Sequence, residues 1–97
     1  MNRTIVLDTP IKRGDNEITE IVVRKPDAGE LRGVTLTDLL QMDVAALIRV
    51  IPRISIPSIA EVEVAKMDPA DLVSIGGAVA GFLLPNSALA EAGLPTD

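Results

Sequence analysis

The spacing of apolar residues changes once along this 97-residue chain, from a repeat of two to a repeat of about three and a half. Before the change, Ile5 to Leu7 and Ile18 to Arg24 are β-branched runs, which favour strands. Proline, glycine, aspartate and asparagine separate the two runs, so we expect a hairpin with a long, irregular connection. The sequence therefore predicts an α+β fold, a small N-terminal β-hairpin (4–24) followed by a bundle of three to four short helices (35–84).

The first two helices have recognisable starts. Thr35 and Asp38 are spaced as a capping box, in which side-chain oxygens accept hydrogen bonds from free backbone N–H groups. Asp43 can cap the next helix, and Pro52 should end or kink it because proline has no N–H to donate. The predicted apolar stripe of this second helix consists of Val44, Leu47, Ile48 and Ile51.

The segment after the second helix allows two interpretations. Ser58 and Glu61 again have capping-box spacing, which favours a helix. Residues 61–64 also alternate between acidic and apolar types, as a strand would. We favour the helix and keep the strand as the alternative.

The last helix has the clearest start in the chain. Asp68 can cap it, a proline follows at the first helical position, and Asp71 lies in the first turn. We expect this helix to reach Leu84. Residues 1–84 should form a single small domain and residues 85–97 a flexible C-terminal tail.

The composition leaves little room for catalysis. The chain has no His and no Cys, which removes the commonest general base, the most reactive nucleophile and the soft metal ligands. Two carboxylate pairs remain, Asp68 with Asp71 and Glu61 with Glu63, and helix capping and a solvated face explain them better. We expect no enzyme activity, no metal and no cofactor.

Net charge and hydropathy exclude two classes of partner. A formal charge of −5 argues against nucleic acid, whose binding depends on Lys and Arg contacts to phosphates. No apolar run approaches the ~20 residues that span a bilayer, and the N-terminus lacks the apolar core of a signal peptide. We expect a protein of the cell interior that binds neither nucleic acid nor membrane.

The last helix has two unlike faces, which implies two neighbours. Either the small-residue face packs closely within the same bundle, or it is a docking face for a partner helix or a second copy. The apolar face consists of Leu72, Ile75, Val79 and Phe82, and the small-residue face consists of Ser74, Gly77, Ala78 and Gly81.

The segment between the strands and the helices carries a distinctive residue order. Gly29 and Gly33 could cradle a phosphate, but the Gly-Lys-Ser/Thr element of such loops is absent. A turn that needs positive φ explains both glycines better. We expect the charges around them to form local ion pairs between Arg24 or Arg32 and the neighbouring acids.

This order of motifs resembles the small tail assembly chaperones of long-tailed bacteriophages, the tail protein E type of contractile-tailed phages and prophages. The resemblance covers roughly Leu7 to Leu84, and Phe82 resembles the aromatic end of the family's last helix. The motif positions that carry it are Arg24, Pro26, Gly29, Leu31, Arg32, Gly33, Asp68 and Asp71.

The resemblance implies a function. Such chaperones bind the helical, aggregation-prone tape measure protein and keep it soluble while the tail tube assembles. They work in the cytoplasm of the infected or lysogenic bacterial host and are not expected in the mature virion. Many have a longer form made by ribosomal frameshifting, so the implied partners are the tape measure protein and a frameshifted form of the chain itself, with a homo-oligomer left open.

The hypothesis for the binding site combines the two apolar stripes into one contact surface. Its residues are Leu47, Ile51, Ile54, Leu72, Ile75, Val79 and Phe82. The main alternative is a small structural or adaptor subunit of a phage tail or related contractile particle. A third is an antitoxin-like or regulatory module that sequesters a partner.

Overall fold

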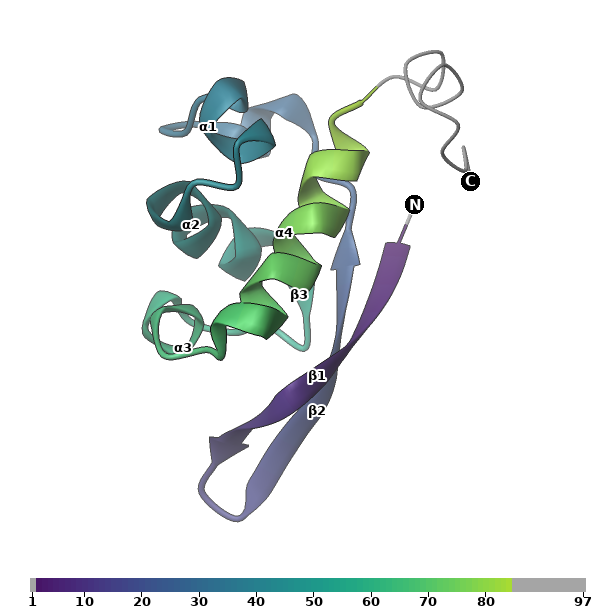
Figure 1. Ribbon diagram of the computed structural model, residues 1–97, viewed down its shortest axis with the longest axis vertical. Helices are drawn as coiled ribbons and strands as arrows, with labels where there is room; N and C mark the ends of the chain where they lie inside the picture. The colour runs from purple at the N-terminus through teal and green to yellow at the C-terminus, as the bar shows by residue number, and fades with distance from the viewer. Residues whose placement is uncertain (1, 85–97) are drawn as a thin grey trace.

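The computed structural model describes residues 2–84, where a three-stranded sheet in the order β1-β2-β3 packs against four α-helices. This arrangement confirms the predicted α+β fold. In Figure 1, α4 runs beside the upper part of the hairpin, α1, α2 and α3 are stacked along α4, and the far end of the hairpin extends past the helices. The predicted tail, 85–97, lies outside the described residues. The elements are β1 (Asn2–Arg13), β2 (Asn16–Arg24), the 3-10 helix η1 (Ala28–Leu31), α1 (Leu36–Leu40), α2 (Val44–Ile54), β3 (Ser55–Ile56), α3 (Glu61–Ala65) and α4 (Pro69–Phe82).

A tight turn, not the expected long connection, joins β1 to β2. The strands pair as far as Arg13 opposite Asn16, so only Gly14 and Asp15 lie between them. Gly14 has a φ of +57°, which two-residue hairpin turns require and most side chains resist. The prediction was wrong because Pro10, taken for a loop residue, lies inside β1 at a break in the pairing.

That break in β1 is held by α4. Between two regular stretches of pairing, residues 7–10 of β1 lie opposite Thr19 alone. The backbone N–H groups of Asp8 and Thr9 donate instead to the carboxylate of Asp71, at 2.7 and 3.0 Å. Asp71 is only 2% exposed. The residue expected merely to favour the start of a helix therefore also fixes α4 to β1.

The predicted helix caps of α1, α2 and α4 are confirmed. In each, a side-chain oxygen accepts a backbone N–H from within the first turn at 2.9–3.0 Å, and the capping residues are Thr35, Asp43 and Asp68. The second carboxylate oxygen of Asp68 accepts the hydroxyl hydrogen of Thr9 at 2.7 Å. The start of α4 thus binds β1 through two of its acids.

Three helix boundaries differ from the prediction. α4 ends at Phe82, two residues before the expected Leu84. α2 continues past Pro52, which lies in its last turn, where a proline removes one hydrogen bond without interrupting the rest. The first turn of α3 is closed by Glu63, whose carboxylate accepts the N–H of Ala60 at 2.8 Å, so Ser58 is not the cap. The helical interpretation of 61–65 is confirmed, and its strand alternative is wrong.

The core lies between the sheet and the helices and is aliphatic apart from Met67 and Phe82. On α2 the buried face includes Val50 and Ile54, while Val44, placed in the predicted stripe, is 55% exposed. The sequence did not predict β3, two residues long, which pairs with Val22 and Val23 of β2. Fully buried apolar side chains are those of Ile21, Val23, Leu39, Leu47, Val50, Ile51, Ile54, Ile59, Val64, Ile75 and Val79.

The glycines of α4 divide into two groups. Gly76 is buried, and a Cβ there would lie 3.0 Å from Cδ1 of Leu47 and 3.1 Å from Cε of Met42. Close packing within the domain therefore accounts for this glycine. A Cβ at Gly77 or Gly81 would meet nothing within 4 Å, so that part of the small-residue face has no neighbour among residues 2–84.

Replacing Asp71 with Ala should lower the free energy of unfolding by about 2–4 kcal/mol, because two part-buried backbone N–H groups lose their charged acceptor. Glu61→Ala is the matched control, since Glu61 is also a first-turn acid but is exposed. Its effect should stay within about 0.5 kcal/mol. Urea denaturation followed by far-UV circular dichroism measures both. Equal effects of the two substitutions would mean that Asp71 does not hold β1.

Gly77→Ala should raise the free energy of unfolding by about 1 kcal/mol, because alanine favours the helix and the position has open space. Gly76→Ala should be less stable than Gly77→Ala by at least about 1 kcal/mol, because its methyl group would press on the buried Leu47. Thermal melts of both variants make the comparison. Equal stabilisation by the two would contradict the close contact.

Candidate functional site

The motif between the sheet and the helices folds as a turn closed by an ion pair. The guanidinium of Arg24 donates to both carboxylate oxygens of Glu30, once at 2.7 Å, and the N–H of Asp27 donates to the same carboxylate at 3.0 Å. The Arg24 hydrogen bonds, helped by that N–H, lower the pKa of Glu30 to about 2. The predicted local ion pair therefore forms with Arg24.

Two arginines of α2 hold the same turn from the other side. Arg53 donates to the carbonyl oxygens of Glu30 and Arg32 at 2.7 and 2.9 Å, and Arg49 donates to that of Gly33 at 3.1 Å. Gly33 has a φ of +83°, as predicted for a turn glycine, whereas φ at Gly29 is not positive. The backbone of the turn is thus fixed to α2.

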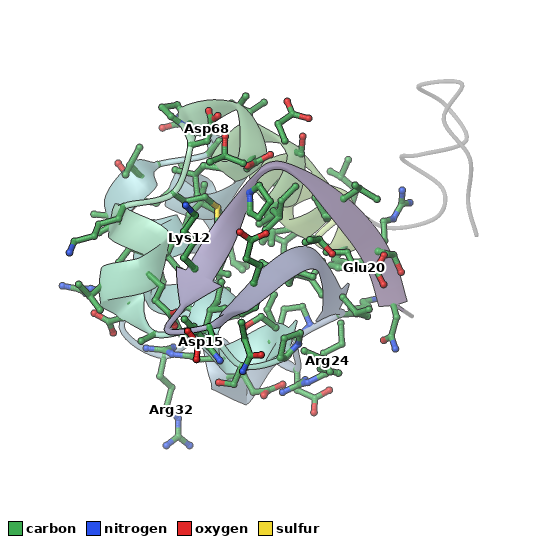
Figure 2. All side chains as sticks on the ribbon, turned by 90° about the horizontal axis from the view of Figure 1, so that it is seen from below. Lys12, Asp15, Glu20, Arg24, Arg32 and Asp68 are labelled. Carbon is green, nitrogen blue, oxygen red and sulfur yellow. The ribbon has the colours of Figure 1, made fainter. Side chains whose placement is uncertain are left out.

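The structure accounts for most motif positions, with two exceptions. Pro26 and Leu31 are buried, and Asp68 and Asp71 bind β1. The side chain of Arg32 extends away from the body of the molecule in Figure 2 and makes no hydrogen bond or ion pair within residues 2–84. Structural roles therefore explain the others except Gly29, which is exposed, has no positive φ and has space for a Cβ.

An apolar groove of about 340 Å³, here called the leucine groove, lies between this turn, α1 and the end of α4. Leu36 and Leu40, one helical turn apart on α1, are 56% and 45% exposed there. Such exposure of two leucines in a concave surface is typical of a protein-binding site. The groove is lined by Lys25, Pro26, Ala28, Leu31, Leu36, Leu40, Phe82, Leu83 and Leu84.

A second groove, of about 330 Å³ and here called the lysine groove, lies at the other end of α4, between the outer part of β1 and α3. Arg13 at the end of β1 holds one of its lining residues: the guanidinium donates to both oxygens of Glu63 at 2.7 and 2.8 Å and to the carbonyl of Ser58 at 2.6 Å. These bonds, with the N–H of Ala60, lower the pKa of Glu63 to about 2. The groove is lined by Thr9, Pro10, Ile11, Lys12, Val62, Glu63, Lys66, Met67 and Asp68.

The structure places the residues of the hypothetical contact surface mainly in the interior. Leu72 is half-buried, and Phe82, though buried, lines the leucine groove. The other five, Leu47, Ile51, Ile54, Ile75 and Val79, are at most 1% exposed. Packing within the domain is therefore sufficient reason for their apolar character, and partner binding by them stays a prediction.

Sequence reasoning missed the residues that do form concave surfaces. Leu36 and Leu40 follow the predicted cap at Thr35, and their spacing of four places both on one side of the helix, a signal that could have found them. Lys12 and Lys66 are 54 positions apart in the sequence, so no spacing rule could join them. The lysine groove forms only in the folded domain, where residues 9–12 of β1 and residues 62–68 line the same surface.

Two kinds of feature are absent from the described residues. Among the described residues, no group of three or more His, Cys, Asp or Glu side chains could hold a metal ion. No helix in that part of the chain is long and apolar enough to cross a membrane. What the arrangement offers is two grooves with fixed walls and aliphatic floors.

Acid should weaken the fold in a defined range of pH. Glu63 has an ordinary pKa of 4.5 when unfolded and about 2 when folded, so the unfolded chain binds more protons between these values. The stability that Glu63 contributes is complete above about 4.5 and is lost as the pH falls towards 2. Urea titrations of wild type and Glu63→Gln should show a stability difference at pH 6 that shrinks towards pH 2. A constant difference would contradict the role of the ion pair.

Comparison with known proteins agrees with the motif order. A family profile described as phage tail assembly chaperone proteins, E, or 41 or 14, matches residues 4–84. Tail assembly protein E of Escherichia phage P2 is 48% identical over 83 residues, covering 86% of this chain and 91% of that protein. Tail assembly protein E' of the same phage is 46% identical over 80 residues, covering 82% of this chain but only 56% of that protein. No solved structure matches. The chain therefore belongs to the family of phage tail assembly chaperones.

Proposed function

We propose that this chain binds the tape measure protein of its phage and keeps it soluble during assembly of the tail tube. The observation that carries the proposal is the leucine groove, where Leu36 and Leu40 stand half exposed above the buried Leu31. An amphipathic helix could place its apolar stripe there, as in other helix-in-groove complexes. Membership of the tail assembly chaperone family supports this choice of client.

The strength of such a contact suits a temporary complex. Covering the exposed part of one leucine contributes on the order of 1 kcal/mol, so Leu36 and Leu40 together account for about a thirtyfold gain in affinity. A client with many apolar turns would be covered by several weakly bound copies that can leave as the tube grows. The net charge of −5 on each copy would keep the complex soluble.

The proposed role needs no bond to be made or broken. We infer that the chain acts without catalysis, in the cytoplasm of the infected or lysogenic host, and is absent from the mature virion. Mass spectrometry of purified virions separates this role from that of a structural or adaptor subunit. Detection of the chain at a fixed copy number per particle would favour the adaptor.

A longer form of the chain is part of the proposal. The E' relative extends well beyond its match, which covers 56% of its length. A frameshifted product that shares residues 4–84 would carry the same two grooves. Its extension could then bind a second tail component while the shared domain holds the client.

Substituting aspartate for both Leu36 and Leu40 should abolish client binding, because two carboxylates would be desolvated against an apolar helix. The assay is co-expression with the tape measure protein, reading the client's soluble fraction after centrifugation. Both positions are exposed, so the variant should keep its melting temperature within a few degrees.

Val73→Asp is the matched control, since Val73 is 60% exposed on α4 and lines neither groove. It should leave the client soluble. Aspartate at Ile51 or Val79 would be a poor test, because both are fully buried and their substitution would unfold the domain. Unchanged client solubility with the double leucine variant would reject the leucine groove as the client site.

A further inference from the structure

We propose that the lysine groove is a second protein-binding site, and that its occupant is an acidic amphipathic peptide segment with apolar side chains flanked by carboxylates. This site goes beyond the proposed function, since it uses other residues at the opposite end of α4. The argument rests on the floor of the groove, its charge and the rigidity of its walls.

The floor of the groove is apolar and open. Val62 is 58% exposed on α3, which has five residues. A valine that faces water does not stabilise so short a helix. Ile11 on β1 is half-buried beside it, and Met67 is almost buried beneath. An aliphatic side chain entering the groove would therefore cover surface contributed by three separate segments.

The charged groups of the groove, counted together with Arg13, are three positive and two negative, so the groove is positive by one although the chain as a whole is negative. Glu63 is paired with Arg13, whereas Asp68 keeps its negative charge and accepts hydrogen bonds from the Thr9 hydroxyl and the Ala70 N–H, at 2.7 and 2.9 Å. The remaining charged groups of the lining are two exposed lysines with no hydrogen bond or ion pair within residues 2–84. They are Lys12 and Lys66.

This combination selects the class of partner. A purely apolar segment would leave both ammonium groups without a partner, and a basic segment would be repelled by them. Nucleic acid is disfavoured by the net charge of −5 and by the absence of aromatic side chains in the lining for bases to stack on. A segment with a carboxylate on each side of a leucine or isoleucine would pair with both lysines and would cover the apolar floor.

The walls of the groove are fixed before any partner arrives. Arg13 ties the end of β1 to α3 through Glu63 and Ser58, and Asp71 ties the break in β1 to α4. A preformed groove loses little conformational entropy on binding, so modest contacts suffice. Figure 2, seen from below the hairpin, shows Lys12 and Asp68 on the side of β1 that faces α3 and the start of α4.

The two grooves are far enough apart to be occupied together. Met67 and Asp68, just before α4, line one, and Phe82 to Leu84, at its end, line the other. A helix of 14 residues is about 21 Å long, which is more than the width of a bound helix. A peptide bound in one groove therefore leaves the other free.

The test measures binding of two labelled 12-residue helical peptides by fluorescence anisotropy. Both carry leucines four residues apart, flanked by glutamates in one and by lysines in the other. The glutamate peptide should bind at least tenfold more tightly, and its affinity should fall several-fold between 50 and 300 mM NaCl. Equal binding of the two peptides would overturn the proposal.

Lys12→Glu combined with Lys66→Glu should weaken binding of the glutamate peptide at least tenfold without changing the melting temperature. Lys25→Glu is the matched control, because Lys25 is also exposed but lines the leucine groove, and it should change the affinity less than twofold. An effect of Lys25→Glu equal to that of the double variant would place the peptide elsewhere and reject the site. Tighter binding of a 12-nucleotide single-stranded DNA than of the peptide would also reject it.

The result of this binding test is independent of the result of the client-solubility test of the leucine groove. The double lysine variant should still keep the tape measure protein soluble, and the double leucine variant should still bind the glutamate peptide. Val62→Asp gives an independent check of the floor and should weaken peptide binding at least fivefold. If Val62→Asp left the affinity unchanged, the groove would not be the binding surface.

Discussion

Two hydrogen bonds from the backbone of β1 to one buried carboxylate determine how the rest of the domain is arranged. Asp71 accepts the N–H groups of Asp8 and Thr9 where pairing with β2 is interrupted. Because the interruption is satisfied from α4, the outer half of the hairpin can continue towards α3, where Arg13 meets Glu63. Without the Asp71 carboxylate, the N–H groups of Asp8 and Thr9 would lose their acceptor, and β1 would no longer be fixed as a wall of the lysine groove.

The motif turn is the corresponding support at the other end of α4. Arg24, Arg49 and Arg53 use their guanidinium groups on a carboxylate and on main-chain carbonyls of one short segment. Arginines that are far apart in the sequence thus fix the conformation of one turn. This turn forms one side of the leucine groove and contributes Leu31 to its lining.

Patterns among neighbouring residues predicted much of this fold, whereas no pattern predicted the contacts between residues far apart in the sequence. The caps at Thr35, Asp43 and Asp68 and the helical period after them depend on neighbours within four residues, so they could be predicted. The apolar stripes were recognised too, but periodicity cannot tell whether an apolar face meets its own chain or a partner. Asp71 with Asp8, and Arg13 with Glu63, join residues 63 and 50 positions apart, and no local pattern announces either pair.

The separation between Asp8 and Asp71 has a consequence for synthesis of the protein. Asp71 lies 63 positions after Asp8, so the whole segment between them must leave the ribosome before the carboxylate that completes β1 becomes available. Up to that moment β2 can pair with β1 and β3, but the N–H groups of Asp8 and Thr9 lack their acceptor. The attachment of β1 to the helices through Asp71 therefore waits until α4 has been made, and a polypeptide that terminates before α4 would lack it.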